Sequence, residues 1–291
     1  MPSLKEVKGR IASVKSTQKI TTAMKMIASV KLRKAQYRTE RFLPYEKQLM
    51  FILNDFLLSE TDFTSPLAEK REVKGVAIVA LSSNSSLCGA FNSNVIHLFR
   101  SVWDEYSSLP TDNRLVYPIG KKMEDFCKKS EIPIQGSWIE LMDKPNFNGA
   151  KELADQLIAD FLAKKIDRVE LVYNHFKNTV IQVPTKEQFL PVVFDLERDP
   201  SPTKNEIDYI LEPDRATIMA SLIPKALCSK IYAILLDSAT AEQAARTMAM
   251  QIASDNADDI LNELTIQFNK QRQQAITSEL LDIIGGAEAL K

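Results

Sequence analysis

The sequence has few of the residues from which catalytic and metal sites are usually built. Its 291 residues include two histidines and three cysteines. The histidines, His97 and His175, stand in no HExxH or Cys–His spacing, and no GxSxG nucleophile motif lies near them. The cysteines, Cys88, Cys127 and Cys228, form no CxxC pair, which excludes a zinc ribbon, argues against a disulfide framework and indicates a reducing compartment. We therefore expect no catalytic group, no metal and no cofactor in this chain.

Phosphate-binding motifs are also missing. The loop "SSNSSLCGAF" follows an apolar run, where a dinucleotide-binding fold carries GxGxxG, but it contains one glycine. The sequence "IGKK" (119–122) lacks both the first glycine and the Ser or Thr of a P-loop. The acidic stretch "SDNADD" (254–259) lacks the glycine-bearing loop that usually holds calcium. We interpret these three segments as a packed turn, a loop before a helix, and a solvated or helix-pairing face.

Long hydrophobic runs are absent as well. "VAIVAL" (76–81) and "IYAILL" (231–236) are typical of the longest, and neither approaches the length needed to cross a bilayer. The N-terminus has no apolar signal core, and its basic residues fit a mature helix better than a presequence. With a net charge of −1, the chain is nearly neutral. The sequence predicts a soluble protein of the cytoplasm.

Glycine and proline are missing from both ends of the chain but not from its middle. Neither occurs between Arg10 and Leu43 or between Lys225 and Ile284. Sixty residues of helix would extend about 90 Å, whereas a compact globule of this size is roughly 50 Å across. Helical patterns of this length are typical of coiled coils. We predict that a helix in residues 1–60 pairs antiparallel with a helix in residues 208–286, and that Gly285–Gly286 ends the second helix.

Apolar spacing and charge support this pairing. No acid lies between Glu6 and Glu40, a segment with nine basic residues, whereas residues 230–263 contain six acids and two bases. Opposite charges beside a shared seam select a partner helix. The predicted register places Val14 near Asn256 and Met24 near Arg246. The predicted seam consists of Leu4, Val7, Ile11, Val14, Thr17, Ile20, Met24 and Ile27, facing Ile231, Leu235, Ser238, Glu242, Ala245, Met248 and Ile252, and then Ala253, Ala257, Ile260, Leu264 and Phe268.

The middle of the chain, residues 70–195, alternates strand and helix signals. "VKGVAIVAL" and "RLVYPI" are typical of buried strands, and "NFNGAKELADQLIADFLAKK" of an amphipathic helix. "RVELVYNHF" followed by "TVIQVPTKEQFLPVVF" indicates a terminal hairpin. The order predicts an α/β domain, Rossmann-like, with a mostly parallel sheet and an antiparallel edge strand. A polar linker then leads into the last helix, which Pro224 should kink or restart.

The two ends of the chain also resemble a known family. "KEVKGRIASVKSTQKITTAMKMIASVKLRKAQ" and "AEQAARTMAMQIASDNADDILNELTIQFNKQRQQAITSELLDIIGGA" closely resemble the gamma subunit of F-type ATP synthases. "VYNHFKNTVIQVPT" and "DYILEPD" are similar to interior motifs of that family. This chain has "SNSSLCG" where the family usually has Asp-Arg-Gly before "LCG". It has no cysteine-bearing insertion of the chloroplast type, and with no presequence the resemblance favours a bacterial protein.

The resemblance implies a central-stalk rotor that binds no nucleotide and is not itself an enzyme. Its expected partners are the alpha and beta subunits, the epsilon subunit and the c-ring, and it reaches the bacterial inner membrane, on the cytoplasmic side, only through the complex. It implies beta-subunit contacts, an apolar bearing and a weaker foot for epsilon or the c-ring. The implied beta-subunit contacts are Met24, Arg246, Arg272, Gln273, Thr277 and Glu279. The implied bearing consists of Ile276, Leu280, Ile283 and Ile284. The implied foot consists of Tyr209 and Glu212.

Other interpretations remain open at this stage. The polar residues near the C-terminus could form an ordinary solvated helix surface, with Arg246 balancing an acidic face. An α/β enzyme with a coiled-coil oligomerisation arm would need a ligand in residues 70–195. A nucleic-acid-associated coiled coil would need salt-sensitive duplex binding, although a pI of about 6.2 and no recognisable module argue against it.

Overall fold

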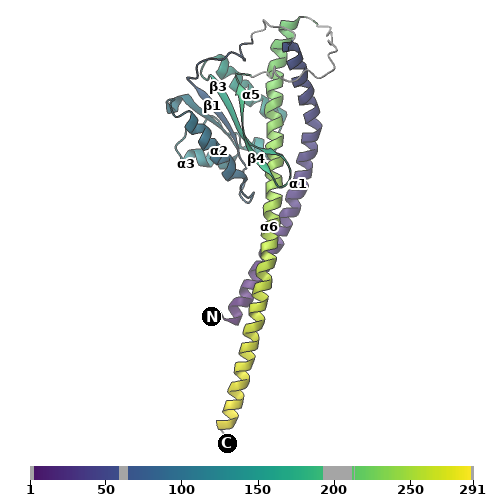
Figure 1. The fold of residues 1–291 in the computed structure, drawn as a ribbon, viewed down its shortest axis with the longest axis vertical. Helices are drawn as coiled ribbons and strands as arrows, with labels where there is room; N and C mark the ends of the chain where they lie inside the picture. The colour runs from purple at the N-terminus through teal and green to yellow at the C-terminus, as the bar shows by residue number, and fades with distance from the viewer. Residues whose placement is uncertain (1–2, 59–64, 193–211, 213, 290–291) are drawn as a thin grey trace. The chain divides into compact units, whose positions relative to one another are not determined.

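The computed structural model describes residues 3–58, 65–192, 212 and 214–289. These residues form two compact units. The first unit combines Met1–Val30 with Arg246–Lys291, and the second is Lys31–Ala245. Two long helices, α1 (Leu4–Leu58) and α6 (Arg215–Ala289), contribute to both units (Figure 1).

The second unit is built on a mixed four-stranded sheet in the order β2-β1-β3-β4. Strands β1 (Val76–Leu81), β2 (Arg114–Ile119) and β3 (Arg168–Phe176) are parallel, and β4 (Gln182–Leu190) is antiparallel to β3. This arrangement confirms the predicted mostly parallel α/β domain and its terminal hairpin.

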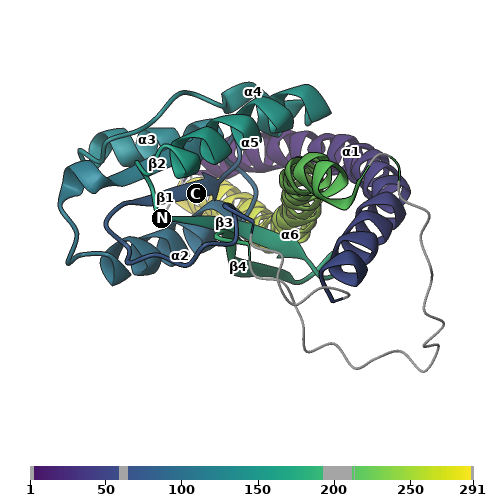
Figure 2. The ribbon, with the colours of Figure 1, turned by 90° about the horizontal axis from the view of Figure 1, so that it is seen from above.

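Both faces of the sheet are covered, which explains why β1 is a continuous apolar run. Val76, Ile78 and Ala80 share a core with α2 (Phe91–Glu105) and α3 (Lys121–Lys129). The alternate side chains of β1 share the opposite core with α5 (Phe147–Leu162) (Figure 2). The side chain of Asn146 accepts a hydrogen bond from the Gly149 N–H (2.8 Å) and caps α5. The short helices η1 (Thr111–Asn113) and α4 (Ile139–Asp143) carried no recognisable sequence signal.

Parts of the long helices complete the core that contains α5. Leu49 and Leu53 of α1 and Ile223, Ile231 and Leu235 of α6 are buried in the same cluster as α5. The segment of α6 at residues 217–287 contains a stretch that is apolar enough and long enough to cross a membrane, but half of that stretch is buried inside the protein. Its buried half needs apolar side chains in order to pack within the protein.

The ends of α6 differ from the sequence-based prediction. The helix is continuous through Pro224, so the predicted restart there is wrong. It also continues through Gly285–Gly286 to Ala289. Neither glycine is among the residues with positive φ, so the left-handed backbone that would cap and end the helix does not form at either position.

Candidate partner-binding surfaces

Side-chain hydrogen bonds join α1 and α6 in the first unit. The Gln18 amide donates to the Asp258 carboxylate, and the Thr21 and Ser254 hydroxyls lie 2.9 Å apart. Thr22 also reaches Ser254, at 3.3 Å. Residue numbers rise along one helix as they fall along the other, which confirms the predicted antiparallel pairing. The second unit contains a similar contact of its own, between the Thr39 and Thr240 hydroxyls at 3.2 Å.

The predicted register of this pair is wrong. Val14 lies seven residues before Thr21, so its neighbour on the antiparallel helix lies seven residues after Ser254, at Leu261, and not at Asn256. By the same count Met24 lies opposite Gln251, five residues from the predicted Arg246. The structure therefore does not bring Met24 and Arg246 together.

The seam follows a strict seven-residue repeat that the apolar pattern alone did not reveal. Ile20, Ile27, Ile252 and Ile260, which were predicted to lie in the seam, are exposed. Small and polar side chains take their place, so the apolar pattern gave the wrong phase after Val14. The buried and half-buried seam positions in the first unit are Leu4, Val7, Ile11, Val14, Gln18, Thr21, Lys25 and Ala28 on α1, and Thr247, Met250, Ser254, Ala257, Leu261, Leu264, Phe268, Gln271 and Ala275 on α6.

An apolar patch remains uncovered on α1. Met26, Ile27 and Val30 are each more than half exposed, and they lie between the basic residues Lys25 and Lys31. Sequence reasoning missed this surface because it assigned Ile27 to the seam. Exposed apolar side chains flanked by lysines suit a partner with apolar and acidic groups.

The residues expected to contact a beta subunit divide into two groups. Arg272, Gln273, Thr277 and Glu279 are all exposed within two turns of α6. The Thr277 hydroxyl donates to the Gln273 carbonyl at 2.9 Å, while the other three side chains project into solvent. Met24 and Arg246 are only partly exposed, and Arg246 interacts with other residues of the chain.

The C-terminal part of α6 presents an uncovered apolar surface where the bearing was predicted. Ile276, Leu280, Ile283 and Ile284 are each at least 50% exposed. Every residue from 276 to 287 is exposed, because the pairing register places the start of α1 beside Gln271 and Ala275. Leu281 is also exposed and widens the stripe beyond the prediction. Within the described residues, nothing covers this surface.

The remaining predicted positions are less informative. Tyr209 lies outside the described residues, and Glu212 is exposed. His97 is an exposed helix residue, in agreement with the interpretation of the sequence. His175 is also exposed, but its Nδ1 lies 2.7 Å from the Asp237 carboxylate and connects β3 to α6. The sequence gave no signal for this pair, because its members are 62 positions apart.

In the part of the chain that the structure describes, potential metal ligands do not cluster. This part contains no group of three or more His, Cys, Asp or Glu side chains placed to hold a metal ion. In the loop after β1, the Ser83 N–H donates to the Asn92 side chain at 3.0 Å, and the Ser83 hydroxyl donates to the Ser85 carbonyl at 2.7 Å. The loop therefore directs these donors inward, as expected for a packed turn.

Comparisons with known proteins cover the whole chain. A family model described as ATP synthase matches residues 3–290. The "ATP synthase gamma chain" of Azobacteroides pseudotrichonymphae is 55% identical over 100% of both chains. That of Phocaeicola vulgatus is 51% identical over 99% of this chain and 100% of its own.

Solved structures share the fold at low sequence identity. A chain from the Euglena gracilis mitochondrial ATP synthase, described as OSCP/F1/c-ring, matches with a TM-score of 0.68 and 19% identity, over 99% of this chain and 94% of that one. A chain from the rotor of the same organism's ATP synthase matches with a TM-score of 0.64 and 17% identity, over 94% and 98%. The combination of sheet and long terminal helices is therefore a shared fold.

Proposed function

Because this chain belongs to the family of ATP synthase gamma chains, we propose that it is the central-stalk rotor of a proton-translocating F-type ATP synthase. Its paired helices turn inside a ring of alternating alpha and beta subunits and couple ion flow through the c-ring to ATP synthesis or hydrolysis. The observation that carries this proposal, beside the full-length family match, is the uncovered apolar end of α6. A helix end of this kind needs a partner that surrounds it.

Each exposed surface of the chain is assigned to a different partner or contact in the complex. The stripe of Ile276, Leu280, Ile283 and Ile284 fits an apolar collar and acts as a bearing. Arg272, Gln273, Thr277 and Glu279 offer charged and amide groups to a beta-subunit loop, with Met24 and Arg246 as further contacts. Glu212, together with Tyr209, is assigned to the foot that meets the epsilon subunit or the c-ring.

The mechanism follows from the asymmetry of two paired helices. Three identical beta subunits around one such pair each face different side chains, because apolar residues such as Met26 are exposed on α1 and acidic residues such as Asp255 and Asp259 are exposed on α6. A shaft can bias a conformation only through differential contacts. Rotation therefore moves each site through states of different nucleotide affinity, and nucleotide turnover in return biases the shaft angle.

In this role the chain itself catalyses no reaction, and the catalytic sites lie on the beta subunits. The Ser83 N–H and hydroxyl support this assignment, because both donate to groups of the chain itself and so are not free to bind a phosphate. The chain needs no cofactor of its own and binds no nucleic acid. We place it on the cytoplasmic side of a bacterial inner membrane, held there by the complex.

A charge placed on the shaft tests the proposal. We expect Met24→Lys to reduce proton-coupled ATP synthesis in membrane vesicles by about tenfold, the effect of a lost or repelled contact of about 1.4 kcal/mol, with little change in assembly. Ala12→Lys, at an exposed α1 position outside the assigned contacts, is the matched control. Unchanged coupling in Met24→Lys would contradict the assignment of Met24 as a beta-subunit contact. Normal coupled synthesis in a strain that lacks the chain would remove the rotor assignment.

A further inference from the structure

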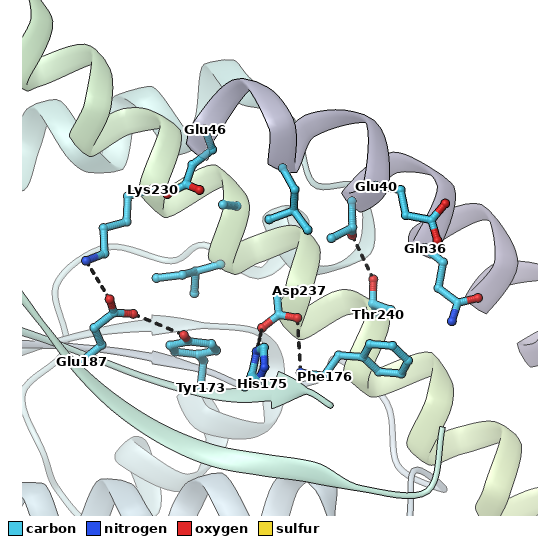
Figure 3. A pocket seen from close by; sticks show the side chains of 14 residues that line it. Gln36, Glu40, Glu46, Tyr173, His175, Phe176, Glu187, Lys230, Asp237 and Thr240 are labelled. Carbon is cyan, nitrogen blue, oxygen red and sulfur yellow. Dashed lines mark hydrogen bonds and ion pairs between the residues drawn. The ribbon is translucent and has the colours of Figure 1, made fainter. Parts of the chain in front are cut away.

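A cavity of about 360 Å³ opens in the second unit between α1, α6 and the β3–β4 hairpin (Figure 3). Its volume lies within the range of small-molecule sites, about 300–1,000 Å³. Leu43, Phe176 and Ile234 supply apolar walls, one from each of the three elements. Polar side chains stand around them, so the cavity combines an apolar surface with groups that can orient a ligand.

The charges around this cavity are mostly negative. Its four carboxylates belong to Glu40, Glu46, Glu187 and Asp237, whereas Lys230 is the only lysine or arginine among its lining residues. Lys230 is already engaged, because its Nζ lies 2.7 Å from the Glu187 carboxylate.

Two pairs of groups inside the cavity satisfy each other. The Tyr173 hydroxyl donates to the other Glu187 oxygen at 3.2 Å. The Asp237 carboxylate lies 2.7 Å from His175 and accepts the Phe176 N–H at 3.2 Å. The sheet side of the cavity is therefore internally paired.

The α1 side is different. Glu40 is exposed and Glu46 is half-buried, and among the described residues neither forms a hydrogen bond or an ion pair, although Lys230 lies close enough to act on Glu46 through space. Burial raises the pKa of Glu46 above its ordinary value, which reflects the cost of a half-buried charge without a direct partner. The two unpaired carboxylates are six residues apart, which is about 9 Å along a helix axis. Leu43 lies midway between them.

We propose that this cavity binds a linear aliphatic diammonium ion, either a free diamine or the terminal diamine segment of a polyamine. One ammonium group pairs with Glu46 and the other with Glu40, while the methylene chain between them lies against Leu43 and Phe176. A ligand with an ammonium group at each end of its chain can reach both carboxylates, whereas the apolar wall disfavours fully hydrated inorganic cations. The proposal does not depend on the assignment of the chain as a rotor.

The test measures ligand binding to the full chain by calorimetry and by the shift in thermal unfolding. We expect 1,6-diaminohexane to bind more tightly than hexylamine by about tenfold, the effect of one additional charged pair of about 1.4 kcal/mol. Diaminoethane, which is too short to span the two carboxylates, should bind no better than hexylamine. Hexanoate should not bind.

Three variants locate the site. Glu46→Gln and Glu40→Gln should each reduce the affinity for 1,6-diaminohexane to that of hexylamine, whereas Glu152→Gln, at an exposed α5 position outside the cavity, should change nothing. These glutamines preserve side-chain shape, and the unfolding curves without ligand report whether each variant folds. Equal affinity for the diamine and hexylamine, or equal losses in all three variants, would overturn the proposal, since both indicate non-specific attraction to an acidic surface.

Discussion

At the scale of single residues, the sequence showed which chemical groups are present, but it did not show which residues they contact in the fold. The histidines and cysteines lack the spacing of a metal site in the sequence, and Cys88, Cys127 and Cys228 are all buried thiols in the structure. The pairing of His175 with Asp237 could not be predicted, because it depends on where β3 crosses α6. Contacts between distant residues are created by packing, and a single sequence contains no direct signal for them.

Asp237 has a predictable effect on stability. Burial raises the pKa of Asp237 above its ordinary 3.8, although His175 and the Phe176 N–H act in the opposite direction. A carboxyl group with a raised pKa favours folding most below pH 3.8, and this contribution is lost as the pH rises through the folded-state value. We therefore expect Asp237→Asn to gain stability relative to the parent chain as the pH rises from below 3.8 to neutral.

Urea unfolding of both proteins across this pH range measures the effect. Asp112→Asn, at an exposed position, is the matched control. A difference between Asp237→Asn and the parent that stays constant with pH, or that favours the variant more in acid, would contradict the expected contribution of this carboxyl group.

At the scale of elements, the strands and helices of the second unit were largely predictable. The strands at Val76–Leu81 and Arg168–Phe176 have strong patterns, because burial on both faces requires apolar runs, whereas the edge strand Gln182–Leu190 was predictable from its place in the hairpin. The antiparallel pairing of the long helices was predictable from their charges and missing helix breakers. Its register was not, because Gln18, Thr21 and Ser254 occupy seam positions where apolar residues were expected.

Cysteine pairs distinguish the two registers. The Thr21 and Ser254 hydroxyls are 2.9 Å apart, so we expect the double substitution Thr21→Cys and Ser254→Cys to form a disulfide on mild oxidation. The pair Val14→Cys and Asn256→Cys, which tests the register predicted from apolar spacing, should remain reduced. Non-reducing electrophoresis of the full chain separates the two outcomes, with the buried native cysteines as an unreactive background. Cross-linking of the second pair alone would restore the earlier register.

At the scale of the whole molecule, the family resemblance implied an apolar bearing near the end of α6, and therefore apolar side chains that this chain leaves exposed. The exposed side chains of Ile276, Leu280, Ile283 and Ile284 agree with that expectation. What the stripe contacts is a property of the complex, and it therefore remains a proposal. Packing within the chain and contact with partner subunits predict different effects of this stripe on the stability of the isolated chain. A surface that packs within the chain contributes to folding, whereas a bearing contributes only to assembly.

Replacing the stripe separates these roles. We expect the triple variant Ile276→Ser, Leu280→Ser and Ile283→Ser to change the unfolding free energy of the isolated chain by no more than about 0.5 kcal/mol per site, because these side chains are already exposed. In the assembled complex each would lose about 1.5–3 kcal/mol of apolar burial. Fewer chains should then co-purify with the alpha and beta subunits from membranes, and ATP synthesis should fall in proportion.

The matched control keeps the segment and changes its polar positions. Gln274→Ser and Asp282→Ser replace two exposed residues of the same helix that lie outside the stripe, and they should leave both assembly and synthesis unchanged. A triple variant that assembles and couples like the parent would show that the partner subunits do not bind this end of α6 through the stripe. A large loss of stability in the isolated chain would instead show that the stripe packs within the protein, and both results would remove the bearing from the proposed mechanism.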